Sequence, residues 1–214
     1  MLRIEHLNAS QAHRAAELHA LGQPDTFLTR LGMAFLEGLY AEMAVSRRCF
    51  GFVVLEDDAV LGVATATTNT RQLFRDLVLR RGWRLGWPVL KQALPHPRLL
   101  WNVLETLFYP GRIAIEEGEA EWLFVGVDPL ARRKGVGHLF AEALKDECKR
   151  LDLRTIKATV DKSNPLIHPY LRAEGFCPEG DFTLYGRPMF VYVCHLPDED
   201  GVRGRSNSRN NKGR

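Results

Sequence analysis

The sequence has little cysteine and no long apolar run. Four cysteines occur among 214 residues, at positions 49, 148, 177 and 194, without the paired spacing of a metal site. Their neighbours are mostly apolar, which is typical of reduced core thiols, so we predict a cytoplasmic location. No segment approaches the roughly eighteen apolar residues of a membrane-spanning helix, and the N-terminus lacks the apolar core of a secretion signal. We therefore expect neither export nor membrane insertion.

An excess of one charge sign is also missing. The formal net charge is only +3, and five cations without any acid fall in the last fourteen residues, Gly201 to Arg214. This balance gives no reason to expect nucleic acid as a partner. We predict a basic, disordered tail over residues 198–214, which are rich in Gly, Ser and Asn. Residues 1–197 have an ordinary hydrophobic content and are expected to form one domain.

Two common nucleotide motifs are absent. Gly135 and Gly137 do not open a Gly-x-Gly-x-x-Gly fingerprint, because position 140 is Phe, and no Gly-x-x-x-x-Gly-Lys-Ser/Thr loop occurs. Classes of protein that depend on either motif are therefore excluded. No Ser-His-Asp or metal-ligating constellation stands out in the sequence, so we predict no metal.

The most informative segment that is present runs from Val127 to Gly137. It leads from an apolar strand into an amphipathic helix through a basic loop with two glycines. Glycine lets the backbone approach a ligand closely, and the first amides of the helix point at an anion with the positive end of the helix dipole. Three consecutive cations, Arg132 to Lys134, add charge. The segment therefore predicts a cradle for a diphosphate.

The order Val-x-Pro followed by Arg-x-x-Gly-x-Gly resembles the coenzyme A signature of the GCN5-related N-acetyltransferase (GNAT) superfamily. The resemblance implies acetyl-CoA as the acyl donor. It also implies that the strand end at 124–127 faces the pantetheine arm, with an amide for the thioester oxygen. The residues assigned to the donor on this basis are Val125, Val127, Arg132, Arg133, Lys134, Gly135, Val136, Gly137, His138 and Asn164.

The predicted order of elements is similar to that superfamily. It implies an α/β fold with a mixed, mostly antiparallel sheet flanked by helices. A helical insertion at about 71–115 interrupts the strands. Strands are predicted at 2–7, 49–55, 60–67, 119–127, 155–161, 182–185 and 189–196, and helices at 10–21, 26–43, 137–151 and 164–174.

Glu121 is the candidate general base. Strand alternation predicts that it shares a face with Leu123, Val125 and Val127, where desolvation would raise the pKa of its carboxyl toward neutrality. A base of that kind suits proton removal from an ammonium. Its distance from the loop also resembles that of the glutamate in the histone-lysine branch of the superfamily. The alternative is a solvated strand end beside Glu119, which is the weaker candidate.

The acid for the departing thiolate is less clearly marked. Asn164 to Phe176 is similar to the superfamily's second conserved segment, which commonly has Tyr five residues before that Phe. Here that position is Leu171. Tyr170 is adjacent, but one residue along a helix turns a side chain by about 100°. Catalysis and packing both stay open for Tyr170, while His168, between prolines, is expected to be structural.

The insertion allows three interpretations. Arg75, Arg80, Arg81 and Arg84 are interleaved with apolar residues, and three of the four tryptophans, Trp83, Trp87 and Trp101, fall here. It could form a lid whose arginines bind an anionic acceptor, such as a nucleotide sugar or a phosphorylated metabolite. It could instead lie through residues 71–101 on a membrane surface. The third interpretation is packing, or contact between the two copies of a homodimer.

Taken together, the resemblance implies an N-acetyltransferase in which the primary amine of a small molecule attacks acetyl-CoA directly. An amino sugar or amino acid is the default acceptor. Two alternatives stay open: a non-catalytic coenzyme A sensor, which Leu171 permits, and an acyltransferase that uses a longer acyl group.

Overall fold

The computed structural model describes residues 1–93 and 115–197. The remainder of the predicted insertion, with Trp101, and the predicted tail lie outside the described residues. In chain order the elements are β1 (Leu2–His6), η1 (Ala9–Gln11), α1 (Ala12–Gly22), α2 (Phe27–Arg30), α3 (Met33–Met43), β2 (Cys49–Glu56), β3 (Ala59–Thr67), α4 (Thr70–Ala93), β4 (Glu119–Val127), η3 (Pro129–Ala131), α6 (Val136–Arg150), β5 (Thr155–Asp161), α7 (Ile167–Ala173), β6 (Cys177–Leu184) and β7 (Arg187–His195).

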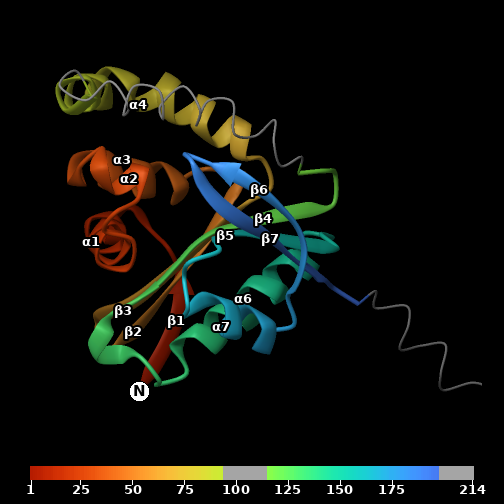
Figure 1. Cartoon of the computed structure of the whole chain (residues 1–214). Coiled ribbons are helices and arrows are strands. Elements are labelled where there is room, and N and C mark those ends of the chain that lie inside the picture. The colour runs from red at the N-terminus through yellow and green to blue at the C-terminus, as the bar shows by residue number, and fades with distance from the viewer. Residues whose placement is uncertain (94–114, 198–214) are drawn as a thin grey trace, which may run out of the picture.

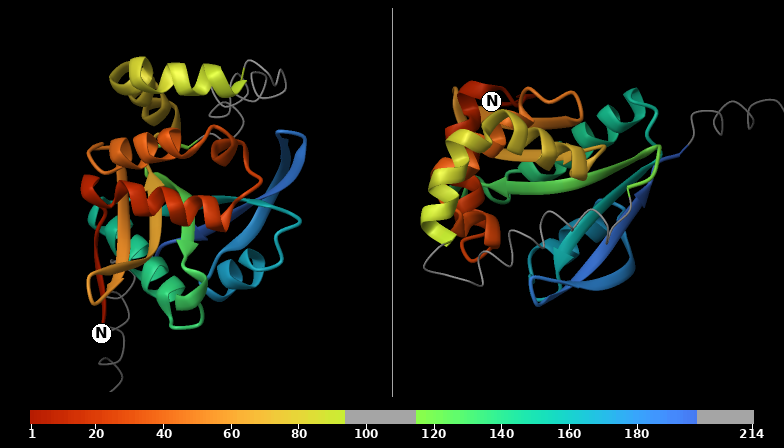
Figure 2. Two further views of the ribbon diagram at one scale, coloured as in Figure 1. Left: turned by 90° about the vertical axis from the view of Figure 1, so that its left-hand side faces the viewer. Right: turned by 90° about the horizontal axis from the view of Figure 1, so that it is seen from above.

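Seven strands form one sheet in the order β1-β2-β3-β4-β5-β7-β6, and every neighbouring pair is antiparallel except β4 and β5. The mixed, mostly antiparallel sheet confirms the predicted fold class. The parallel pairing covers only Glu119–Trp122 against Thr155–Ala158, although both strands continue beyond it. Figure 2 shows the two strands diverging from this junction. The sheet is therefore split in its middle.

A bulge in β4 changes which side chains share a face. Thr65 pairs with Phe124 and Ala66 pairs with Trp122, so Leu123 is an extra residue on its strand. Leu123 and Phe124 both pack in the core beside α1 and α3, whereas Val125 and Val127 pack on the opposite side. The prediction that Glu121 shares a face with those two valines is wrong, because strict alternation fails at a bulge.

Helices cover both faces of the sheet (Figure 1). On one face, α1 and α3 pack around Ala15, Leu36 and Leu39, and Leu73 of α4 joins the same core. On the other, α6 packs through Phe140 and its neighbours. Burial of these apolar side chains is the main favourable term that holds both layers on the sheet. Within residues 1–93 and 115–197, no helix combines the length and the apolar character needed to cross a membrane.

Two predicted boundaries need correction. The helix predicted over 26–43 is two helices, because Gly32 adopts φ 93° between α2 and α3. The strand predicted from Phe182 begins already at Cys177, and its first five residues are exposed, so no alternation of buried and exposed residues marks them. The helical character predicted for the start of the insertion is confirmed by α4.

Candidate functional site

The loop after β4 is held by Asp128. Its backbone amide donates to the carbonyl of Leu61 at 2.7 Å, and one carboxylate oxygen accepts from the amide of Leu130 at 2.9 Å. The other oxygen accepts from the guanidinium of Arg14 at 2.6 Å, which ties the loop to α1. The short turn η3 therefore leaves the strand in a fixed direction.

The residues predicted to form the cradle lie where this loop enters α6. Gly135 caps the helix in the left-handed conformation, with φ 82°, and Arg133 also has a positive φ of 65°. The amides of Val136, Gly137 and His138 open the helix, and so lack the carbonyl partner four residues back that later amides have. Arg132 and Arg133 are exposed, and the ammonium of Lys134 lies 3.0 Å from Glu56. Helix amides without an intrahelical partner and three cationic side chains, of which Lys134 is paired with Glu56, therefore lie at one helix end.

Tyr170 packs against this helix end. Its hydroxyl donates to the carbonyl of Gly137 at 2.7 Å, and its ring meets Trp122 edge-on with centroids 6.1 Å apart. A Cβ added to Gly137 would lie 3.0 Å from the Tyr170 ring, a tight contact that glycine avoids. Burial raises the pKa of the Tyr170 phenol well above its ordinary value. The geometry thus ties α7 to the first turn of α6.

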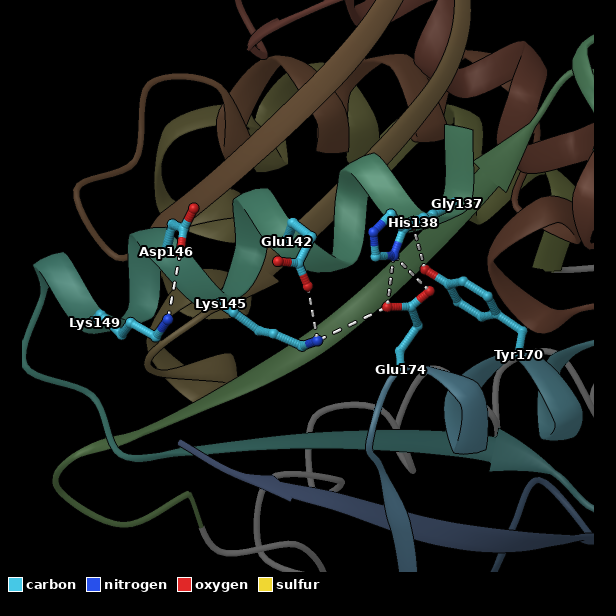
Figure 3. A network of polar contacts seen from close by, with 8 residues as sticks. All are labelled: Gly137, His138, Glu142, Lys145, Asp146, Lys149, Tyr170 and Glu174. Atoms are coloured by element: carbon cyan, nitrogen blue, oxygen red, sulfur yellow. Dashed lines mark hydrogen bonds and ion pairs between the residues drawn. The ribbon is translucent and has the colours of Figure 1, made fainter. Parts of the chain in front are cut away.

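A polar network continues from that turn along α6 (Figure 3). The His138 ring nitrogen Nδ1 lies 3.2 Å from both carboxylate oxygens of Glu174, and the ammonium of Lys145 lies 3.0 Å from Glu142 and 3.8 Å from Glu174. His138, Glu142 and Glu174 bring potential metal-ligating atoms within 4.8 Å of one another. The ammonium of Lys145 lies between the two carboxylates and pairs with both, so the cluster is a salt-bridge network in this structure.

A cavity of about 790 Å³ lies where β4 and β5 separate. Its walls come from the α1–α2 connection, α3, the start of α4, both diverging strands, α7 and the β6–β7 turn. Three predicted site residues line it: Glu121, Val125 and Asn164. Leu171 is also in the lining, at the position where the resemblance leads one to expect tyrosine, whereas Tyr170 is not.

Glu121 is buried in this cavity wall. It is 3% exposed, and the hydroxyl of Thr70, at the start of α4, donates to its carboxylate. The alternative of a solvated strand end is therefore wrong for Glu121. Glu119 is held by Lys157 at 2.5 Å and does not line the cavity, which agrees with its lower rank as a candidate.

A histidine and a tyrosine in the same cavity wall were not identified as candidates from the sequence. His19 is 3% exposed, its Nδ1 lies 2.8 Å from the hydroxyl of Tyr40, and its ring stacks on Phe124 with centroids 4.4 Å apart. Burial lowers the pKa of His19 to about 4 and raises the pKa of Tyr40. The available signal was spacing, since His19 continues the helical stripe of Ala12, Ala15 and Ala16, whereas Leu21 of the predicted stripe is 56% exposed.

The remaining polar candidates have local partners. The Asn164 side chain accepts from the amide of Leu166 at 3.1 Å, so it shapes the turn before α7. The ring of His168 bridges the hydroxyl of Tyr192 at 3.1 Å and the carbonyl of Lys162 at 3.2 Å. That bridging position agrees with the structural role expected for His168.

Helix α4 packs on α3 and reaches the cavity. Leu73 and Leu77 are buried, and Arg80 and Arg81 lie 3.3 and 3.4 Å from the buried carboxylate of Glu42. Phe74 lines the cavity beside Thr70. Among the described residues, the arginines that line the cavity are Arg30 and Arg187, and none comes from α4. The start of the insertion is thus a cavity wall, and the membrane and dimer interpretations stay predictions.

Residues 16–176 match the sequence profile of the acetyltransferase (GNAT) family. The chain belongs to the GNAT family. Solved GNAT structures share the fold at low sequence identity, and no curated protein sequence matches the chain. Among the similar structures are PaiA N-acetyltransferase from Thermoplasma acidophilum in complex with coenzyme A (TM-score 0.59, 10% identity, 92% of this chain and 99% of that one), the ribosomal-protein-S18-alanine N-acetyltransferase from Escherichia coli (0.54, 16%, 94% and 98%), and a spermidine N-acetyltransferase chimera from Vibrio cholerae and hSSAT (0.55, 17%, 91% and 95%).

Proposed function

We propose that this GNAT protein transfers the acetyl group of acetyl-CoA to the primary amine of a small molecule. The observation that carries the proposal is a buried carboxylate, Glu121, in the wall of a cavity at the point where β4 and β5 diverge. The cavity volume of about 790 Å³ falls in the range of about 300–1,000 Å³ that is typical of small-molecule pockets.

The donor side fits the diphosphate of coenzyme A. Backbone amides at the start of α6 supply hydrogen bonds, and Arg132 and Arg133 supply exposed positive charge. Gly135 and Gly137 keep side chains away from this end. We assign the pantetheine arm to the divergence of β4 and β5, where strand backbone groups of Leu123 to Val127 have no β5 partner. This assignment is based on the chain's membership of the GNAT family.

In the proposed reaction, the neutral amine attacks the thioester carbonyl, and Glu121 takes the proton from the amine directly or through water. The C–S bond then breaks and the thiolate leaves. A thiol with a pKa of about 8.5 is a tolerable leaving group, so the reaction does not depend on a side-chain acid at Leu171. Thr70 fixes the orientation of the Glu121 carboxylate by donating to it.

A thiol-release assay with acetyl-CoA and a panel of primary amines tests this function. The proposal predicts thiol release that depends on amine and protein together. The panel contains amino acids, amino sugars and polyamines, and acetyl- and palmitoyl-CoA are compared as donors. Faster release from palmitoyl-CoA would assign the longer acyl group instead.

Calorimetry with acetyl-CoA separates enzyme from sensor. Binding with thiol release supports the proposal, and binding without release by any amine would support the sensor that Leu171 permits. No heat of binding would overturn the assignment of the cradle itself. The double variant Arg132→Ala/Arg133→Ala tests the cradle directly, because removal of the two exposed cations should weaken acetyl-CoA binding while the fold is kept.

A further inference from the structure

We propose that His19 selects the acceptor, by donating a hydrogen bond from Nε2–H to an oxygen of the amine substrate. This inference rests on the proposed function and narrows the acceptor class. The substrate would carry a carbonyl, carboxylate or hydroxyl oxygen near its amine. A plain alkylamine of the same shape would be a poor acceptor.

The first step is the tautomer of His19. Within the described part of the chain, the Tyr40 hydroxyl has one hydrogen-bond partner, the Nδ1 atom of His19 at 2.8 Å. If the phenol donates to Nδ1, the proton of the neutral imidazole must sit on Nε2. If instead Nδ1–H donated to the phenol oxygen, the buried phenol O–H would lack an acceptor and the unprotonated Nε2 would lack a donor. The Nε2–H tautomer leaves fewer buried groups unsatisfied and is therefore favoured.

The second step is the unpaired atom that this tautomer leaves. His19 Nε2 is a buried nitrogen without a hydrogen-bond partner in the structure. A buried donor without an acceptor costs about 1–3 kcal/mol, so it favours any ligand that supplies an oxygen. The pKa of the ring, lowered to about 4 by burial, keeps His19 a neutral donor rather than a cation at neutral pH.

The third step is location. One face of the His19 ring stacks on Phe124 at an interplanar angle of 11°, and the Nδ1 edge of the ring is held by the hydroxyl of Tyr40. His19, Tyr40 and Glu121 all line the same cavity. Nε2 itself is covered by protein atoms, so an acceptor whose amine lies at Glu121 meets this donor on the α1 wall once the side chains over it shift. Rigid placement of this kind is what lets a single hydrogen bond discriminate between substrates.

The experiment compares pairs of amines of similar shape in which one member carries an oxygen atom near the amine and the other does not. L-leucine and L-leucinamide are paired with isoamylamine, L-phenylalanine with phenethylamine, and glucosamine with cyclohexylamine. For at least one pair, the oxygen-bearing member should have a kcat/KM at least about tenfold higher. Equal use of both members across all pairs, or preference for the plain amines, would overturn the inference.

Variants at His19 connect this preference to the ring nitrogen. His19→Phe keeps a ring that can stack on Phe124 but has no donor, so the KM of the oxygen-bearing amine should rise while the KM of acetyl-CoA is unchanged. His19→Gln restores an N–H donor near the Nε2 position and should recover part of the preference. A merely structural role predicts instead that both variants lose activity toward both members of a pair in parallel with a loss of thermal stability.

Nitrogen NMR of the His19 ring gives a readout that does not require turnover. In the free protein we expect protonated Nε2 and unprotonated Nδ1, and the Nε2 resonance should shift when L-leucinamide or glucosamine is added with acetyl-CoA. Isoamylamine should cause no such shift. The Nδ1–H tautomer, or an Nε2 resonance that no oxygen-bearing amine moves, would overturn the inference. If no amine releases thiol, the proposed function fails, and the tautomer result still decides the role of His19.

Discussion

The candidate groups on the two sides of β4 differ in kind. On the side of α6, the cradle is a contiguous and largely exposed stretch, from Asp128 to His138, whose chemistry comes mainly from backbone amides. On the cavity side, the candidate groups are buried side chains far apart in sequence, such as His19, Tyr40 and Glu121. In the proposed function, therefore, acetyl-CoA is held by a local stretch of backbone, whereas the acceptor site is assembled by the tertiary fold.

The bulge at Leu123 lies between these two sides. It turns Phe124 toward His19 on one face and Val125 toward the α6 core on the other. The extra residue shifts the alternation by one, so Phe124 rather than Val125 packs on the side of α1 and α3. Bulges occur often beside active sites because they redirect side chains without ending the strand.

Glu121→Gln should cause the largest effect on the cavity side. The amide keeps the shape and can still bond to Thr70, but it cannot take a proton. We expect kcat to fall by about a hundredfold to ten-thousandfold, with acetyl-CoA affinity unchanged, as measured by thiol release and calorimetry.

Glu119→Gln is the matched control for that substitution. It lies two residues earlier on the same strand, pairs with Lys157 and does not line the cavity. Its kcat should stay within about threefold of the wild type, because general base catalysis requires contact with the amine or with one bridging water. Full activity of Glu121→Gln across the pH range would remove Glu121 from the mechanism.

His19 should make stability depend on pH. Its pKa is lowered from 6.5 to about 4 by burial, so the unfolded chain binds this proton first as the pH falls. The contribution of His19 to the free energy of unfolding is complete above pH 6.5 and is lost as the pH falls from 6.5 to 4. It amounts to roughly 3 kcal/mol in total. Urea unfolding at pH 7 and pH 4.5 should show a smaller acid loss for His19→Gln than for the wild type.

His13→Gln is the control for this pH effect. His13 is exposed on the same helix, and its pKa is raised mainly by its hydrogen bond to Glu37. Because the pKa of His13 shifts in the opposite direction, its removal should leave the acid loss due to His19 in place. An identical pH dependence for the wild type and His19→Gln would contradict the buried, neutral ring.

The comparison also explains which parts could be predicted from the sequence. Gly135, Gly137 and the three cations predicted the cradle because its spacing is continuous along the chain. Glu121 was found because a carboxylate in an apolar strand is conspicuous. His19 was missed because its partner Tyr40 is twenty-one residues away on another helix. The bulge was missed because it depends on pairing between β3 and β4, which no local pattern records.

Gly135→Ala should weaken the cradle without touching the cavity. Gly135 caps α6 at φ 82°, and an alanine there costs about 1–2 kcal/mol of strain or shifts the helix start. We expect acetyl-CoA to bind about tenfold more weakly by calorimetry. Gly175→Ala carries similar strain, with φ 88°, at the end of α7, and should lower stability while keeping the affinity. Equal loss of affinity in both variants would argue against a local backbone device.

Tyr170→Phe should produce the smallest effect on kcat. It tests whether the Tyr170 hydroxyl acts as an acid in the cavity or only joins α7 to α6. The substitution removes the hydrogen bond to the Gly137 carbonyl, which is worth about 1 kcal/mol of stability, and leaves the ring packed on Trp122. Because the hydroxyl is committed to α6 and Tyr170 does not line the cavity, kcat should change by no more than about twofold, whereas loss of a general acid would lower it by about a hundredfold or more. A large fall in kcat, with loss of the alkaline limb of the pH profile, would show that Tyr170 leaves the Gly137 carbonyl during turnover and acts as the acid after all.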